Sequence, residues 1–233
     1  MLGSSSLTET LTMILALVPA LVIAIVFHEV AHGYVAKLLG DPTASQQGRL
    51  SLNPIRHVDP VGTLLVPAGM YLLSGAAFGW AKPVPVNARR LRNPRYGMMA
   101  VAAAGPASNL LLGAIGAVLL GMLVYLTDMS QTELANSLTV TMLVYFMQIN
   151  VFLALFNLLP IPPFDGSHIL QGLLPREASR IFGNLQQYGM FVIIVIIAAS
   201  MAFGTGFISS IVLPPVNWMM GHYLALASWV AGG

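Results

Sequence analysis

The chain has 233 residues, of which 57% are hydrophobic and only 8% are charged. This composition lies outside the range of soluble globular domains and indicates a polytopic membrane protein, and a net charge of +2 gives no reason to expect a nucleic-acid partner. Because the chain has no cysteine, disulfides, thiolate ligands and cysteine nucleophiles are excluded, and a zinc site would have to be built from histidine and carboxylate.

The first hydrophobic segment, about residues 10–39, is long enough to cross a bilayer and contains an H-E-x-x-H motif formed by His28, Glu29 and His32. Histidines four positions apart share one face of a helix, so His28 and His32 can bind one metal ion. Glu29 lies about 100° around the helix from His28, near enough to act as a general base without becoming a ligand. Ionisable side chains are costly at membrane depth, and metal binding accounts for both histidines together.

Residues 41–87 combine turn signals with one further apolar run. Residues 46–54 read as turns around a short strand, and the run 61–80 has basic residues on both flanks, which favours a re-entrant segment over a simple span. Residues 80–87 read as extended chain or as a proline-rich surface linker. Pro83 and Pro85 remove donors from one edge, so Val84 and Val86 are candidate substrate-binding residues on the edge that keeps its donors.

Three more hydrophobic segments follow, at about 96–126, 137–159 and 188–213. In the first, small residues at intervals of four predict close helix packing, with Asn109 donating a hydrogen bond between helices. The second ends in Asn157-Leu-Leu-Pro-Ile-Pro-Pro-Phe-Asp165, where three prolines must break the helix. Residues 214–233 are too short and too interrupted to predict a span.

All ten basic residues fall on one side of this predicted topology, whereas the connection 127–136 carries acids and no basic residue. The positive-inside rule therefore predicts an outside N-terminus, with the basic loops and the opening of the site toward the cytoplasm. We expect one integral membrane domain, 1–233, with an all-α polytopic fold of about five hydrophobic segments.

A catalytic zinc site needs a third protein ligand on the basic side of the membrane. Two candidates remain: Asp165, placed after the helix break, and Asp59, which could instead form a turn or support a ligand. Asp165 is favoured. His168 could orient Asp165 or lie at the interface, and the role of His57 stays open.

Together these motifs resemble the site-2 protease family of intramembrane zinc metalloproteases, peptidase family M50. The match consists of His28-Glu29-x-x-His32, Gly105-Pro106-x-x-Asn109, and Asn157-x-x-Pro160-x-Pro162-x-x-Asp165-Gly166, in that order in apolar segments. The resemblance implies one Zn²⁺ per chain held by His28, His32 and Asp165, with Glu29 as the catalytic base and Asn157 holding the substrate or the oxyanion. It also implies a three-helix core, short membrane-associated β-strands near the active site, and a minimal form without a PDZ or CBS domain.

The predicted function is hydrolysis of peptide bonds within or next to transmembrane segments of substrate proteins. We expect this to take place in the lipid bilayer of the cell membrane of a prokaryote. The alternative is a metal-binding membrane transporter or receptor without hydrolytic activity. A membrane peptidase with Glu177 as the third ligand is disfavoured, because Glu177 adjoins Arg176 on an expected surface. The oligomeric state is not predicted.

Overall fold

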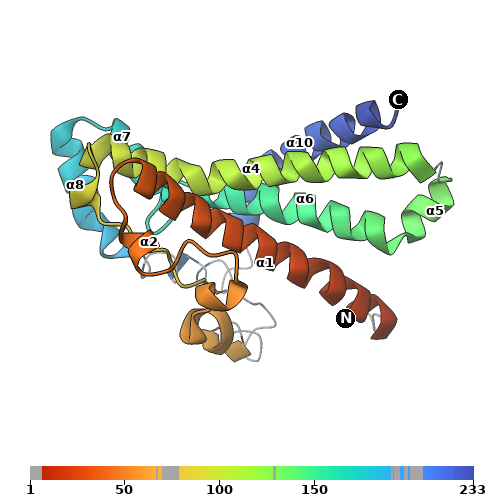
Figure 1. Cartoon of the computed structure of the whole chain (residues 1–233), viewed down its shortest axis with the longest axis horizontal. Coiled ribbons are helices and arrows are strands. Elements are labelled where there is room, and N and C mark those ends of the chain that lie inside the picture. The colour runs from red at the N-terminus through yellow and green to blue at the C-terminus, as the bar shows by residue number, and fades with distance from the viewer. Residues whose placement is uncertain are drawn as a thin grey trace.

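The computed structural model describes residues 7–66, 68–69, 79–127, 130–189, 191, 195–196, 199 and 207–233. Three of its helices are long and apolar enough to cross a membrane: α1 (Leu7–Leu38), α4 (Pro94–Thr127) and α6 (Leu138–Asn157). They occupy the segments predicted at 10–39, 96–126 and 137–159. Each packs against the other two, so they form a three-helix core (Figure 1).

The two ends of this core differ in charge. The short helix α5 (Gln131–Asn136) joins α4 to α6 at one end, and α2 (Thr43–Gln46), α7 (Asp165–Leu173) and α8 (Arg176–Gln186) gather at the other (Figure 1). The ten basic residues belong to the last turn of α1, to residues 49–95 and to α8, away from α5. The predicted segregation of charge is therefore present in the fold.

The chain reverses direction after α6 and brings Asp165 back to the core. Helix α6 ends at Asn157, and the prolines that follow cannot continue it. A Cβ on Gly166 would lie 2.2 Å from the Leu158 carbonyl oxygen, so the reversal requires a glycine there. At the far end of α7, the Arg95 Nε donates to the Gly172 carbonyl oxygen at 3.0 Å, which ties α7 to the start of α4.

The C-terminal residues form a helix that the sequence did not predict as a span. Helix α10 (Phe207–Val230) continues through two prolines and packs against α4 and α6. A Cβ on Gly121 would lie 2.4 Å from the Ala227 carbonyl oxygen, so small residues of α4 allow α10 this close. The Tyr223 hydroxyl also donates to the Leu110 carbonyl oxygen at 2.6 Å. Tertiary packing thus stabilises a helix that the local sequence disfavours.

The short β-strands predicted near the site are not confirmed, since none of the residues that the structure describes is in a strand. The region instead contains the 3₁₀ turns η1 (Pro54–His57) and η3 (Ala88–Arg90), the π turn η2 (Pro60–Leu65), and extended chain at 80–87. Most of the apolar runs 61–80 and 188–213 lies outside the described residues.

Candidate metal centre

His28 and His32 of α1 and Asp165 of α7 converge on one point in the core. The Asp165 Oδ2 lies 3.1 Å from the His28 Nε2 and 3.3 Å from the His32 Nε2. The two imidazole rings are perpendicular, with centroids 4.6 Å apart. One ligand atom from each of the three residues lies within 4.8 Å of the others, and no other such group of His, Asp or Glu occurs among the described residues.

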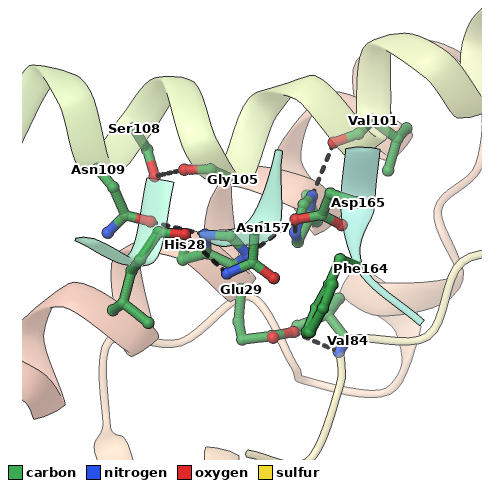
Figure 2. A network of polar contacts seen from close by, with 12 residues as sticks. His28, Glu29, Val84, Val101, Gly105, Ser108, Asn109, Asn157, Phe164 and Asp165 are labelled. Atoms are coloured by element: carbon green, nitrogen blue, oxygen red, sulfur yellow. Dashed lines mark hydrogen bonds and ion pairs between the residues drawn. The ribbon is translucent and has the colours of Figure 1, made fainter. Parts of the chain in front are cut away.

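Helix α4 lies behind His28 (Figure 2) and also contacts the His32 imidazole, so it forms a wall behind both rings. The His32 Nδ1 lies 2.7 Å from the Val101 carbonyl oxygen, and the His28 Nδ1 lies 2.7 Å from the Asn109 Oδ1. A Cβ on Gly105 would lie 2.5 Å from the His32 Nε2, so the glycine leaves the space that the rings occupy. The α4 wall therefore directs the Nε2 atoms of both histidines toward Asp165.

The arrangement leaves polar atoms that a cation would satisfy. The Asp165 Oδ2 is buried and has no hydrogen-bond partner among the described residues. A carbonyl oxygen only accepts, so the His32 Nδ1 carries the hydrogen and its Nε2 presents a lone pair to Asp165. Two imidazole nitrogens and one carboxylate oxygen are a donor set that zinc takes in catalytic sites, with a fourth position left for water or substrate. These residues fit a zinc ion.

Glu29 lies on the opposite side of the histidines from α4 and is not part of the cluster (Figure 2). Its Oε2 accepts a hydrogen bond from the Val84 backbone N–H at 2.8 Å. The close approach depends on Gly33, where a Cβ would lie 2.8 Å from the Val84 Cγ1. The extended segment 80–87 thus positions the carboxylate that the sequence assigns as the base.

A second carboxylate anchors the same extended segment. Asp41 is fully buried and accepts from the backbone N–H groups of Asn87 and Thr43, the latter at 3.1 Å. Burial raises the pKa of Asp41, but its hydrogen bonds with Thr43 and Asn87 outweigh this and hold the pKa below its usual value. The segment 80–87 is therefore attached to α1 and the residues just after it at two points.

These contacts change the prediction for Val84 and Val86. The sequence predicted that both keep free donors on one edge, but the Val84 N–H is already bonded to Glu29. Val86 is half-buried and packs against a cluster that includes Ala36, Leu91 and Val101. The edge is thus not free at Val84, because a carboxylate of the neighbouring helix satisfies its donor.

Asn157 is the last residue of α6, and Figure 2 draws it in the same view as the three converging side chains. Its Nδ2 donates to the Leu153 carbonyl oxygen of the same helix at 2.9 Å, and the side chain is half-buried. The amide oxygen and a second N–H hydrogen are chemically available for other partners.

The remaining candidates lie elsewhere. Asp59 accepts from the backbone N–H groups of Val61 and Gly62 and caps η2, so the structure does not bring this alternative ligand to the cluster. The His57 Nε2 faces the Ser51 carbonyl oxygen at 2.8 Å. His168 contacts Gln186, and burial lowers the pKa of its imidazole.

The sequence predicts a role in helix packing for Asn109 and indicates no site role for Gly105 or Asn150. An asparagine in the middle of an apolar helix is a signal that could have identified Asn150. The Val101 carbonyl could not have been found, because a backbone acceptor leaves no mark in the sequence.

Comparisons with known proteins agree with one another. The model of peptidase family M50 matches residues 16–200. The "Putative zinc metalloprotease YwhC" of Bacillus subtilis (strain 168) is 43% identical over 169 residues, which cover 72% of this chain and 74% of the relative. The "Putative zinc metalloprotease Rip2" of Mycolicibacterium smegmatis is 29% identical, over 73% of this chain and 61% of that protein. The "Putative zinc metalloprotease Rip2" of Mycobacterium tuberculosis (strain H37Rv) is 28% identical, over 74% of this chain and 62% of that protein. No solved structure matches the chain significantly.

Proposed function

The chain belongs to peptidase family M50 and is a site-2 protease-like intramembrane zinc metalloprotease, and from this premise we propose which of its residues perform the reaction. His28, His32 and Asp165 hold the zinc ion, and Glu29 is the general base. The observation that supports this assignment most directly is the buried Asp165 Oδ2, which faces two imidazole nitrogens without a hydrogen-bond partner among the described residues.

When bound, zinc supplies Lewis acidity, polarising the scissile carbonyl and making a water molecule more acidic. Glu29 takes the proton of the attacking water at a carboxylate oxygen and delivers it to the leaving amide nitrogen. The carboxylate is one helix position from His28 and is held by a single backbone N–H, so it lies beside the cluster without occupying a ligand position.

Asn157 would bind the developing oxyanion through its Nδ2. A donor of this kind is typically worth about 3–4 kcal/mol in the transition state. The position of Asn157 at the end of α6, seven residues before the buried Phe164 that precedes Asp165, supports this role.

The substrates would be transmembrane segments of other proteins. The amides of such a segment are hidden in helical hydrogen bonds, so the scissile stretch has to unwind and then needs new backbone partners where water is scarce. We assign this role to the extended segment 80–87. The unwound substrate would pair with it as an added strand, along the edge that carries the Val84 and Val86 backbone donors. Because the Val84 N–H is bonded to Glu29 in the structure, pairing at this edge would release the carboxylate for proton transfer.

A test of strand addition uses two substitutions at one position. Val86→Pro removes the backbone donor at this position and leaves the Val84 contact with Glu29 in place. Val86→Thr keeps the backbone donor and has a side chain of similar shape. We expect cleavage of a single-span substrate to fall in the proline variant alone. Equal turnover in both variants would reject pairing at this edge.

The membrane topology is also a proposal, and it rests on the distribution of apolar and basic residues along the chain. The whole chain would be one domain with about five hydrophobic segments, and most of the segments 61–80 and 188–213 lies outside the residues that the structure describes. The basic end of the core would face the cytoplasm of a prokaryotic cell, because Lys and Arg mark that side of a membrane protein.

The experiment that tests the proposed function measures zinc content and substrate cleavage in detergent-purified wild type, Glu29→Gln and Glu177→Gln. Glu29→Gln should keep one zinc per chain and lose turnover by about 10²–10⁴-fold, because only the base is removed. Glu177 is exposed on α8, so Glu177→Gln should match the wild type in both measurements. Full turnover in Glu29→Gln would contradict the assignment of the base, whereas a zinc-loaded wild type without turnover would leave the metal-transporter alternative, which the family match and named relatives do not favour.

A further inference from the structure

We propose that Asn109 and Asn150 are positioning residues that select the tautomer of His28, so that its Nε2 is presented to the metal. The inference rests on the proposed ligand role of His28. It starts from two asparagine side chains that are both 0% exposed, one in α4 and one in α6. Buried amides in an apolar helix bundle must find partners within the protein, and these two find them in each other and in α1.

The network has only one consistent direction. The Asn150 Nδ2 donates to the Phe146 carbonyl oxygen at 2.8 Å, so its Oδ1 is the atom that faces Asn109. The Asn109 Nδ2 therefore donates to the Asn150 Oδ1 at 2.9 Å, and it also donates to the Ala24 carbonyl oxygen at 3.0 Å. Both carbonyls only accept, so each one independently fixes the orientation of an amide.

The orientation of Asn109 decides where the hydrogen of His28 lies. With both of its Nδ2 hydrogens committed, Asn109 turns its Oδ1 to His28, at 2.7 Å from the Nδ1. An amide oxygen can only accept, so the His28 Nδ1 carries the hydrogen and the Nε2 carries the lone pair. The Nε2 is the atom that lies 3.1 Å from the Asp165 Oδ2. A rotated Asn109 amide would present a donor to the Nδ1 and favour the opposite tautomer.

The same geometry links all three core helices to one ligand. His28 lies in α1, Asn109 in α4 and Asn150 in α6, and the chain of hydrogen bonds ends on the α6 backbone at Phe146. His32 needs no such relay, because its Nδ1 bonds a backbone carbonyl directly. Partners behind a metal-bound histidine typically change metal affinity by about 10–100-fold when removed, and we expect that range for Asn109.

The first test reads the tautomer in the unsubstituted protein. ¹⁵N-histidine-labelled full chain, loaded with zinc, is measured by NMR, and the His28 signals are identified by their loss in His28→Gln. We expect the hydrogen on Nδ1 and the metal on Nε2. The reverse assignment at His28 in a zinc-loaded protein would overturn the inference whatever any variant does. A wild type that binds no zinc would instead refute the proposed ligand set, and this inference with it.

The second test compares zinc affinity, measured by competition with a chelator, in Asn109→Leu, Asn109→Asp, Asn150→Leu and Ser108→Ala. Asn109→Leu should lose about 10–100-fold in affinity. Asn109→Asp keeps an acceptor for the His28 Nδ1 and should recover part of that loss. Asn150→Leu should lose less than Asn109→Leu, because the Ala24 carbonyl still orients Asn109.

Ser108→Ala is the matched control. Among the described residues, the Ser108 hydroxyl donates at 2.7 Å to the Gly105 carbonyl oxygen of its own helix, so the zinc affinity of the variant should equal that of the wild type. Wild-type affinity in a folded Asn109→Leu would overturn the inference. If Asn109→Leu does not fold, the test is made on Asn150→Leu. Wild-type zinc affinity and an unchanged His28 NMR signal in Asn150→Leu would contradict a hydrogen-bond relay from Phe146 through Asn150 and Asn109 to His28.

Discussion

The two sides of the candidate metal centre are built in different ways. On the α4 side, the His28 and His32 Nδ1 atoms lie beside hydrogen-bond acceptors of α4, and Gly105 leaves room for both rings to pack against this helix. On the other side, Glu29 accepts a hydrogen bond from the Val84 backbone N–H of the extended segment 80–87 (Figure 2). This segment is attached by that bond, by the Asn87 contact with Asp41 and by the packing of Val84 and Val86. Helix packing thus positions the proposed ligands, and the proposed base is bonded to a segment with which, in the proposal above, a substrate backbone would pair.

This difference suggests a division of labour. Metal binding requires fixed distances, which the packing of α1 and α7 against α4 provides. In the proposed mechanism, proton transfer requires the Glu29 carboxylate to become available when substrate arrives, and its one hydrogen bond to Val84 would be exchanged at that point. Substitutions on the α4 side should therefore act through zinc, and substitutions on the segment 80–87 side should act through turnover with zinc retained.

The largest expected effect comes from breaking the ligand set itself. Asp165→Ala removes the oxygen that both imidazoles face, so zinc should be lost and turnover should fall to background. Zinc content by mass spectrometry and cleavage of a single-span substrate check this. One zinc per chain in a folded Asp165→Ala protein would show that the third ligand lies elsewhere.

The second expected effect separates the holding of zinc from stabilisation of the transition state. Asn157→Leu should reduce kcat by about 10²–10³-fold through loss of an oxyanion donor, with zinc content unchanged. The kcat and KM of a fluorogenic substrate distinguish this from weaker substrate binding. A rise in KM with unchanged kcat would assign Asn157 to substrate binding alone.

The third expected effect tests the packing against α4. In Gly105→Ala, the added Cβ would lie 2.5 Å from the His32 ring and 2.6 Å from the His28 Cε1, so the rings must move. We expect zinc affinity to fall by about 10–100-fold, as for other displaced ligands. Gly221→Ala is the control, since its Cβ would meet nothing within 4 Å. Equal zinc affinity in the two variants would mean that the α4 wall does not constrain the ligands.

The smallest expected effect is on the segment 80–87 side. Asp41→Asn removes a charged acceptor from the Asn87 and Thr43 contacts and should lower the free energy of unfolding by about 1–2 kcal/mol, with zinc content retained. The control is Glu133→Gln, which alters an acid that also accepts a backbone N–H, but at the opposite end of the core. Zinc loss in Asp41→Asn would contradict the division between the two sides.

The Asp41 contact also has a defined pH dependence. Because its folded pKa is lowered, its stabilising contribution is present above the ordinary aspartate pKa of about 3.9 and is lost as the pH falls through the folded value. The difference in stability between wild type and Asp41→Asn should therefore be constant near neutral pH and shrink below about pH 4. Thermal unfolding between pH 3 and 8 measures this.

Local patterns were sufficient for the parts of the fold that depend on hydropathy. The lengths of α1, α4 and α6 follow from apolar runs that only a membrane-spanning helix explains, and the break before Asp165 follows from three prolines. The absence of the expected strands from the described residues has a non-local cause. Backbone donors that could have joined a ladder, at Val84 and Asn87, are bonded to the carboxylates of Glu29 and Asp41, which are far away in sequence.

Hydropathy and helical periodicity were enough to predict the membrane class of this protein and the candidate residues His28, Glu29, His32 and Asp165, because they are local properties. The three-dimensional packing was needed to show that Asp165, and not Asp59, meets the histidines, that Asn109 and Asn150 lie behind His28, and that Glu29 is bonded to Val84. These contacts join residues that are 41 to 137 positions apart in the sequence. They depend on how the helices pack against one another, and no pattern within a single helix specifies them.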